Sequence, residues 1–170
     1  MDYRLRQLDK KPESRFEPFR SFEFVVPFDY VHKKRLARFY EANNSRFNFY
    51  HPGITDESYN ASHCLIPGAR YKANIFAIKG GNSSEYCIHF MKLQKSLFIN
   101  APGLSLLWEQ KRDLLPQGWL VGFDEEISFL SGEVPCLCKD SEGNWDFSES
   151  PYDTEDWSPI CYLVCVYLII

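Results

Sequence analysis

The sequence has neither a long apolar segment nor an apolar start. Its longest apolar run, 161–170, is about half of the roughly 20 residues that a membrane-spanning helix needs. Residues 1–20 are polar and rich in charge, which predicts a flexible N-terminal arm and no signal peptide. We therefore expect no membrane span, and a protein that is cytoplasmic or virion-associated. Its six cysteines are then expected to be reduced and structural.

The common motifs of catalysis and metal binding are also missing. The four histidines are scattered, and neither Gly-x-Ser-x-Gly nor His-Glu-x-x-His occurs. Cys136 and Cys138 are separated by one residue, not the two of a zinc knuckle, and no second pair of ligands follows them. The sequence therefore predicts a protein that is not an enzyme and that holds no metal and no cofactor.

Adjacent carboxylates at 124–126 are the best candidates for catalysis. Such groups could act as acid and base, but neighbours on a strand point to opposite faces and converge poorly. Capping of the next turn, or a position facing solvent, is the better interpretation. A hydrolase that uses Asp124 or Glu125 stays as a third alternative.

The charge is small and unevenly placed. The formal net charge is -4, so nucleic acid is not expected as the main partner. Residues 1–46 lean basic, whereas 139–157 are strongly acidic. This asymmetry supports an alternative function, a small inhibitor from a phage or mobile element that docks its acidic patch on a basic partner enzyme.

The hydrophobic patterns predict one α+β domain over 21–170. Two amphipathic helices, about 84–94 and 104–115, should pack on a mostly antiparallel sheet, and Asp29 should cap a further helix that ends near Asn43. Alternation also predicts strands, at 22–26, 70–79, 119–123 and 161–168. We expect the first and last of these strands to lie side by side.

The acidic segment alternates large apolar and small polar side chains. On a strand, Trp145 and Phe147 would face inward while Asp146 and Ser148 face outward. The simpler interpretation is an edge hairpin with a solvated face. The sharper hypothesis is a ligand-binding surface whose short polar side chains are held by a rigid frame.

A resemblance extends over roughly 22–168 and is strongest over 93–125. The segments APGLSL (101–106), WEQKRD (108–113), LPQGW (115–119) and FDE (123–125), with Val-Pro at 134–135 and Trp157 before a Cys/Leu-rich strand, are similar to a group of uncharacterised bacterial proteins. That group resembles the variable proteins of diversity-generating retroelements. The resemblance implies a C-type-lectin-like fold that binds a protein or other macromolecular ligand through a variable region, here 134–162.

In those systems a reverse transcriptase rewrites adenines near the 3′ end of the gene. An AAC codon changed at its adenines can give Asn, Asp, Ser, Cys or Ile, but not Trp, Glu, Lys or Gln. The candidate variable, ligand-binding positions are Cys136, Cys138, Asp140, Asn144, Asp146, Ser148, Ser150, Asp153, Asp156, Ser158 and Ile160. The expected scaffold positions are Trp108, Trp119, Trp145, Phe147 and Trp157.

Overall fold

The computed structural model describes residues 15–59, 63–125, 132–151, 157 and 159–170. Candidate positions Asp153, Asp156 and Ser158 and most of the expected N-terminal arm lie outside these residues. The first strand begins at Phe16, so the arm cannot extend to residue 20 as expected.

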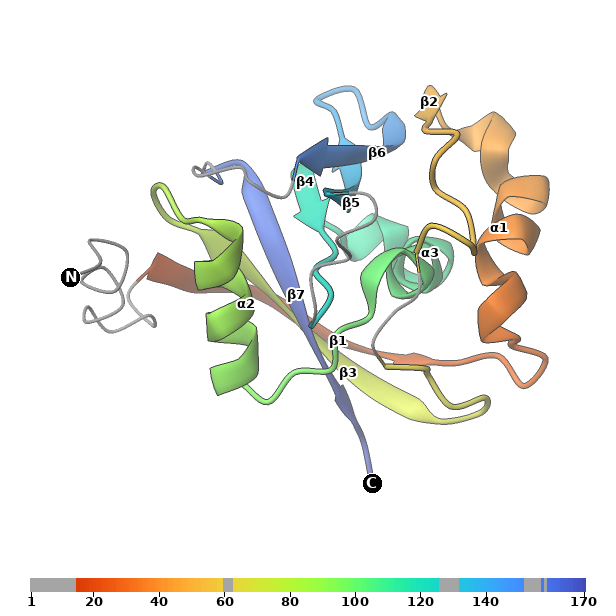
Figure 1. Ribbon diagram of the computed structural model, residues 1–170, viewed down its shortest axis with the longest axis horizontal. Helices are drawn as coiled ribbons and strands as arrows, with labels where there is room; N and C mark the ends of the chain where they lie inside the picture. The colour runs from red at the N-terminus through yellow and green to blue at the C-terminus, as the bar shows by residue number, and fades with distance from the viewer. Residues whose placement is uncertain (1–14, 60–62, 126–131, 152–156, 158) are drawn as a thin grey trace.

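Within the described residues, the chain forms an α+β domain with three α-helices on a mixed, mostly antiparallel sheet of seven strands (Figure 1). The strands are β1 (Phe16–Val25), β2 (Phe49–Tyr50), β3 (Arg70–Ile78), β4 (Gly118–Val121), β5 (Glu133–Lys139), β6 (Trp145–Pro151) and β7 (Cys161–Leu168). The helices are α1 (Arg35–Asn43), α2 (Ser84–Leu93) and α3 (Asn100–Lys111), with short 3-10 turns at His32–Lys34, Asn44–Arg46 and Arg112–Leu114. The strand order is β1-β3-β7-β4-β5-β6-β2, with parallel pairs at β4–β7 and β2–β6.

The expected pairing of the first strand with the last is wrong. β1 pairs with β3, and β3 lies between β1 and the C-terminal strand β7. The reason lies in burial: β3 buries side chains on both faces, with Ile75 on one side and Ile78 on the other, whereas most of β1 is exposed. A strand with a largely polar, exposed surface is better suited to a sheet edge than to the interior.

Helix boundaries follow partly from local sequence and partly from distant groups. Ser83 caps α2 by accepting a hydrogen bond from the backbone N–H of Tyr86, which confirms the expected start. α3 starts earlier than expected because Pro102 lies in its first turn, where proline is tolerated. Asp29 does not cap α1; instead the Asp56 carboxylate accepts from the first backbone N–H groups of that helix.

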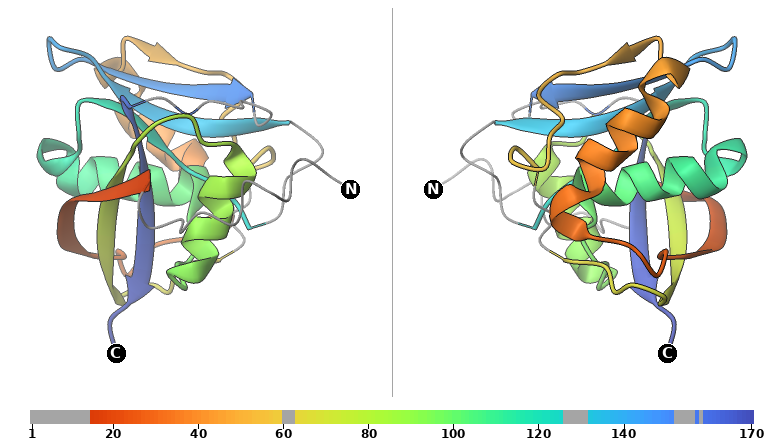
Figure 2. Two further views of the ribbon diagram at one scale, coloured as in Figure 1. Left: turned by 90° about the vertical axis from the view of Figure 1, so that its left-hand side faces the viewer. Right: turned by 90° about the vertical axis from the view of Figure 1, so that its right-hand side faces the viewer.

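The sheet separates two apolar cores, and Figure 2 shows α2 in front of it in one view and α1 with α3 in front in the other. On the α1/α3 face, Leu36, Phe39 and Trp108 pack against Val164 and their neighbours in the sheet. On the α2 face, the helix packs Tyr86, Phe90 and Met91 against Leu163, Cys165 and Val121. The buried side chains of these two cores therefore fix which face of the sheet each strand residue occupies.

A buried polar contact joins α1 to α3. Arg35 is only 9% exposed, although it is charged. Its Nε donates to Ser105 Oγ at 2.7 Å and its Nη2 lies 2.7 Å from Glu109 Oε2. Asn43 Nδ2 donates to the other Glu109 oxygen at 3.1 Å, so the carboxylate is satisfied from both sides.

Gly118 allows β4 to lie close to the segment before β7. Its φ is +110°, and a Cβ added there would lie 2.3 Å from the carbonyl oxygen of Ile160. The next residue, Trp119, donates its backbone N–H to that same oxygen at 3.0 Å. The close approach therefore depends on glycine for both conformation and space.

We predict that Gly118→Ala lowers the free energy of unfolding by more than about 2 kcal/mol, because the strained φ and the collision add. Gly143 is the matched control: its φ is +89°, but an added Cβ meets nothing within 4 Å. Gly143→Ala should cost only the conformational strain, about 1–2 kcal/mol. Urea denaturation of both variants measures the difference. Equal losses in the two variants would contradict the close approach.

Candidate functional site

The candidate site is built on the hairpin of β5 and β6, and Asp140 holds its turn. Asp140 Oδ1 accepts from the backbone N–H groups of Glu142 and Asn144, both at 2.8 Å. Its Oδ2 accepts from the Asn144 side chain at 2.9 Å. These hydrogen bonds lower the pKa of Asp140, and the one from the Asn144 side chain has the largest effect. Asp140 and Asn144 therefore hold the turn as well as facing outward.

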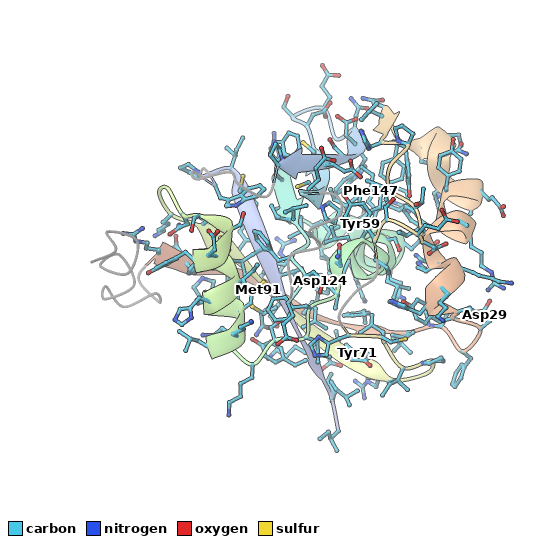
Figure 3. The ribbon with its side chains drawn as sticks, viewed as in Figure 1. Asp29, Tyr59, Tyr71, Met91, Asp124 and Phe147 are labelled. Carbon is cyan, nitrogen blue, oxygen red and sulfur yellow. The ribbon has the colours of Figure 1, made fainter. Side chains whose placement is uncertain are left out.

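The alternation predicted along β6 is confirmed. Phe147 and Trp145 are buried, with exposed fractions of 0% and 7%, whereas Asp146 and Ser148 on the opposite face are half-buried. Figure 3 shows Phe147 below β6 on the side of α3. The pleat thus separates the side chains that hold this strand from those that reach the surface.

The frame beneath β6 is an aromatic cluster from several elements. The Phe147 ring lies 6.1 Å from that of Phe39 on α1, at 87°, and 5.3 Å from that of Tyr50 on β2, at 76°. Trp145 meets Trp108 of α3 edge-on at 6.3 Å. Edge-to-face contacts of this kind add to the stabilisation from burial.

The other two expected scaffold tryptophans lie on the α2 face. Trp157 is 3% exposed, donates its indole N–H to Ser84 Oγ at 2.9 Å and meets the Phe123 ring edge-on. Trp119 is half-buried, so it contributes to the surface as well as to the core.

Strand register brings four half-buried or exposed residues into one line across the sheet. Phe49 pairs with Asp146, Asp146 with Cys138, and Cys138 with Trp119. Directly paired residues project from the same face, and adjacent strands are about 4.8 Å apart. We call Phe49, Asp146, Cys138 and Trp119 the cross-strand row; it lies on the face that α2 covers elsewhere.

The remaining described candidates do not all reach the surface. Cys136 was expected at the displayed surface, and this expectation is wrong. Its side chain is 0% exposed and belongs to the core on the α2 face. Ser148 and Ser150 are half-buried on the same face as the cross-strand row, paired with Cys136 and Val134. Ile160 is 59% exposed, just before β7.

Burial, followed by the charges of Asp146 and Asp140, raises the pKa of the Cys138 thiol to about 11. An ordinary cysteine has a pKa of about 8.5. Cys138 is therefore a neutral thiol at physiological pH and a poor nucleophile.

A second cluster, which the sequence did not reveal, fixes the outer edge of the hairpin. His51 Nδ1 lies 2.9 Å from Glu149 Oε2, and the Glu149 side chain is only 7% exposed. A hydrogen bond shared with the Glu149 carboxyl group raises the pKa of Glu133. Burial raises the pKa of Tyr59, and Glu149 raises it further. Since His51 follows β2, this contact ties β2 to β6.

Asp124, the first of the carboxylates considered for catalysis, is held by hydrogen bonds from its neighbours. Asp124 Oδ2 accepts from Asn100 Nδ2 at 3.0 Å, and its Oδ1 accepts from the backbone N–H of Glu125 at 2.7 Å. Asp124 is therefore held by hydrogen bonds through both carboxylate oxygens, and Glu126 lies outside the described residues. Elsewhere His89 is exposed on α2, and in the part of the chain that the structure describes no three His, Cys, Asp or Glu side chains are placed to hold a metal ion.

Comparison with known proteins identifies no relative: no family model, curated protein or solved structure matches this chain. Among the described helices, none has the length and apolar character needed to cross a membrane. The interpretation of the site therefore depends on its own geometry.

We predict that the two faces of β6 differ sharply in their effect on stability. Trp145→Ala should lower the free energy of unfolding by about 3–5 kcal/mol, because it leaves a cavity beside Trp108. Ser148→Ala, on the other face, should change it by no more than about 0.5 kcal/mol. Thermal and urea denaturation measure both values. The reverse ranking would show that the frame is wrongly assigned.

We also predict that Cys138 stays protonated to unusually high pH. In a Cys64→Ser background, which removes the exposed cysteine, alkylation of Cys138 by iodoacetamide should rise about tenfold per pH unit and not level off below about pH 10. The native protein, which keeps Cys64, shows how much the exposed thiol adds to the total alkylation. A rate that levels off near pH 8.5 would contradict the effect of burial and of Asp146.

Proposed function

We propose that this protein binds a macromolecular ligand through changeable side chains displayed on a C-type-lectin-like frame, as variable proteins of diversity-generating retroelements do, and that it performs no catalysis. The observation that carries the proposal is the division of the β5–β6 hairpin. Its inner face is buried around Phe147 and Trp145, while Cys138, Asp146 and Ser148 are partly exposed on the opposite face, beside the buried Cys136.

The strand order supports the lectin-like part of this proposal. The expected fold has two helices packed on the sheet and a strand that pairs with the C-terminal strand. The sequence suggested that 22–26 fills this place, but β3 has these properties: it precedes α2 and α3 and pairs with β7. On this interpretation 70–168 is the lectin-like unit, and β1 is an additional edge strand.

The burial of individual side chains narrows the variable set. Among the described candidates, Cys138, Asp146, Ser148, Ser150 and Ile160 reach the surface without holding the frame. A displayed position must tolerate substitution, and partly exposed positions outside the core generally do. Cys136 does not meet this condition, because it is fully buried.

The DNA around the gene tests the proposal. We expect a reverse-transcriptase gene nearby, together with a near-copy of the 3′ coding end that differs only at adenines. The differences should fall in the codons of Cys138, Asp146, Ser148, Ser150 or Ile160. Codons of Trp145 and Glu149 provide the internal control, since no adenine change in an Asn codon produces Trp or Glu. A locus without such a copy would contradict diversification.

A further inference from the structure

The cross-strand row has the chemistry of a site for an organic cation. Resting on the ligand-binding function proposed above, we propose that Phe49, Asp146 and Trp119 form a subsite for the guanidinium group of an arginine side chain on a protein ligand.

Asp146 carries an unsatisfied acceptor. Its Oδ1 is buried and has no hydrogen-bond partner among the described residues. Buried polar atoms are almost always paired, and one left unpaired is destabilising. Asp146 as a whole is half-buried, so a donor from a ligand can still approach the carboxylate. Because Oδ1 itself has almost no solvent-exposed surface, a ligand would donate to this half-buried carboxylate from its open side.

The surroundings of Asp146 favour a positive donor. Lys139, the basic residue of the hairpin, projects from the other face, where its Nζ lies 5.4 Å from the centre of the Trp145 ring. Asp140 is exposed in the adjoining turn, and its charge and that of Asp146 both act on Cys138, where they stabilise the neutral thiol. The row therefore carries negative charge, while Lys139 of the same hairpin lies on the opposite face.

The aromatic residues at the two ends of the row select among cations. Phe49 is 48% exposed on β2, next to Asp146, and Trp119 is half-buried on β4, beyond Cys138. A guanidinium group is planar, stacks on aromatic faces and binds a carboxylate through two parallel hydrogen bonds. An ammonium group is a more strongly hydrated point charge, which gains less from such a surface.

A protein fits this site better than a free small molecule. The row lies on the outer surface of a pleated sheet, and such a surface buries only part of any small ligand, whereas tight small-molecule sites enclose most of theirs. An arginine presented by a folded partner can be a binding anchor surrounded by further contacts. Ser148 and Ser150, on the same face, would provide adaptable hydrogen bonds around it.

The test is titration of the ¹⁵N-labelled full chain with the capped pentapeptide Gly-Ala-Arg-Ala-Gly and with its citrulline and lysine counterparts. Citrulline matches arginine in shape but is neutral. We expect saturable shifts of the Cys138 and Asp146 amides and of the Trp119 indole with the arginine peptide. The citrulline peptide should bind at least tenfold more weakly, and the lysine peptide should be intermediate. No saturable shift with the arginine peptide, or equal binding of arginine and citrulline or of arginine and lysine, overturns the proposal.

Two variants separate a local contact from general acidity. Asp146→Asn should weaken arginine-peptide binding at least tenfold. Glu142→Gln, which removes an exposed carboxylate from the neighbouring turn, should change it less than twofold. Equal effects would overturn the proposal; should Asp146→Asn fail to fold, the peptide comparison on the unaltered chain decides. A locus without the adenine-coded copy would contradict diversification and leave these binding results unaffected.

Discussion

The arrangement of the hairpin depends on one packing constraint: the Phe147 ring is fully buried in an aromatic cluster that α1, β2 and α3 supply together. A strand has a side-chain period of two, so fixing this ring also fixes Asp146 and Ser148 on the other face. A slip of one residue would place a carboxylate against Trp108 and an aromatic ring in water. The buried residues beneath β6 therefore determine which of its side chains reach the surface.

A second constraint sets where the hairpin stands on the molecule. β7 joins the two halves of the sheet, because it pairs with β3 on one side and, in parallel, with β4 on the other. Its central residues are buried on both faces, as is typical of a strand inside a sheet rather than at its edge. The contact of Gly118 with the Ile160 carbonyl begins this parallel pairing, so the short loop before β7 is held against β4.

The sequence predicted those features that neighbouring residues decide. The start of the helix near residue 84 and the alternation along β6 follow from local chemistry, and the structure confirms them. It did not predict features that depend on distant partners. Asp56 caps α1 from a separate loop, and Cys136 is buried because α2 and its neighbours cover that part of the sheet. Composition cannot distinguish these cases, because a cysteine or an aspartate suits several positions equally well.

The same dependence on distant partners explains why the sequence did not predict Phe49 as part of the cross-strand row. Phe49 reaches it only through the parallel pairing of β2 with β6, which no local pattern announces. β2 is two residues long, and a strand of that length has little stability of its own. Backbone hydrogen bonds from Asn48 to Trp145 and from His51 to Phe147 hold it in place.

The His51–Glu149 contact then fixes the chain just beyond β2. Glu149 therefore positions Phe49 without touching the outer face, and any ligand that uses Phe49 depends on a carboxylate it never meets. If Ser148 and Ser150 vary as proposed, this dependence gives a physical reason for Glu149 to stay constant, separate from the coding argument.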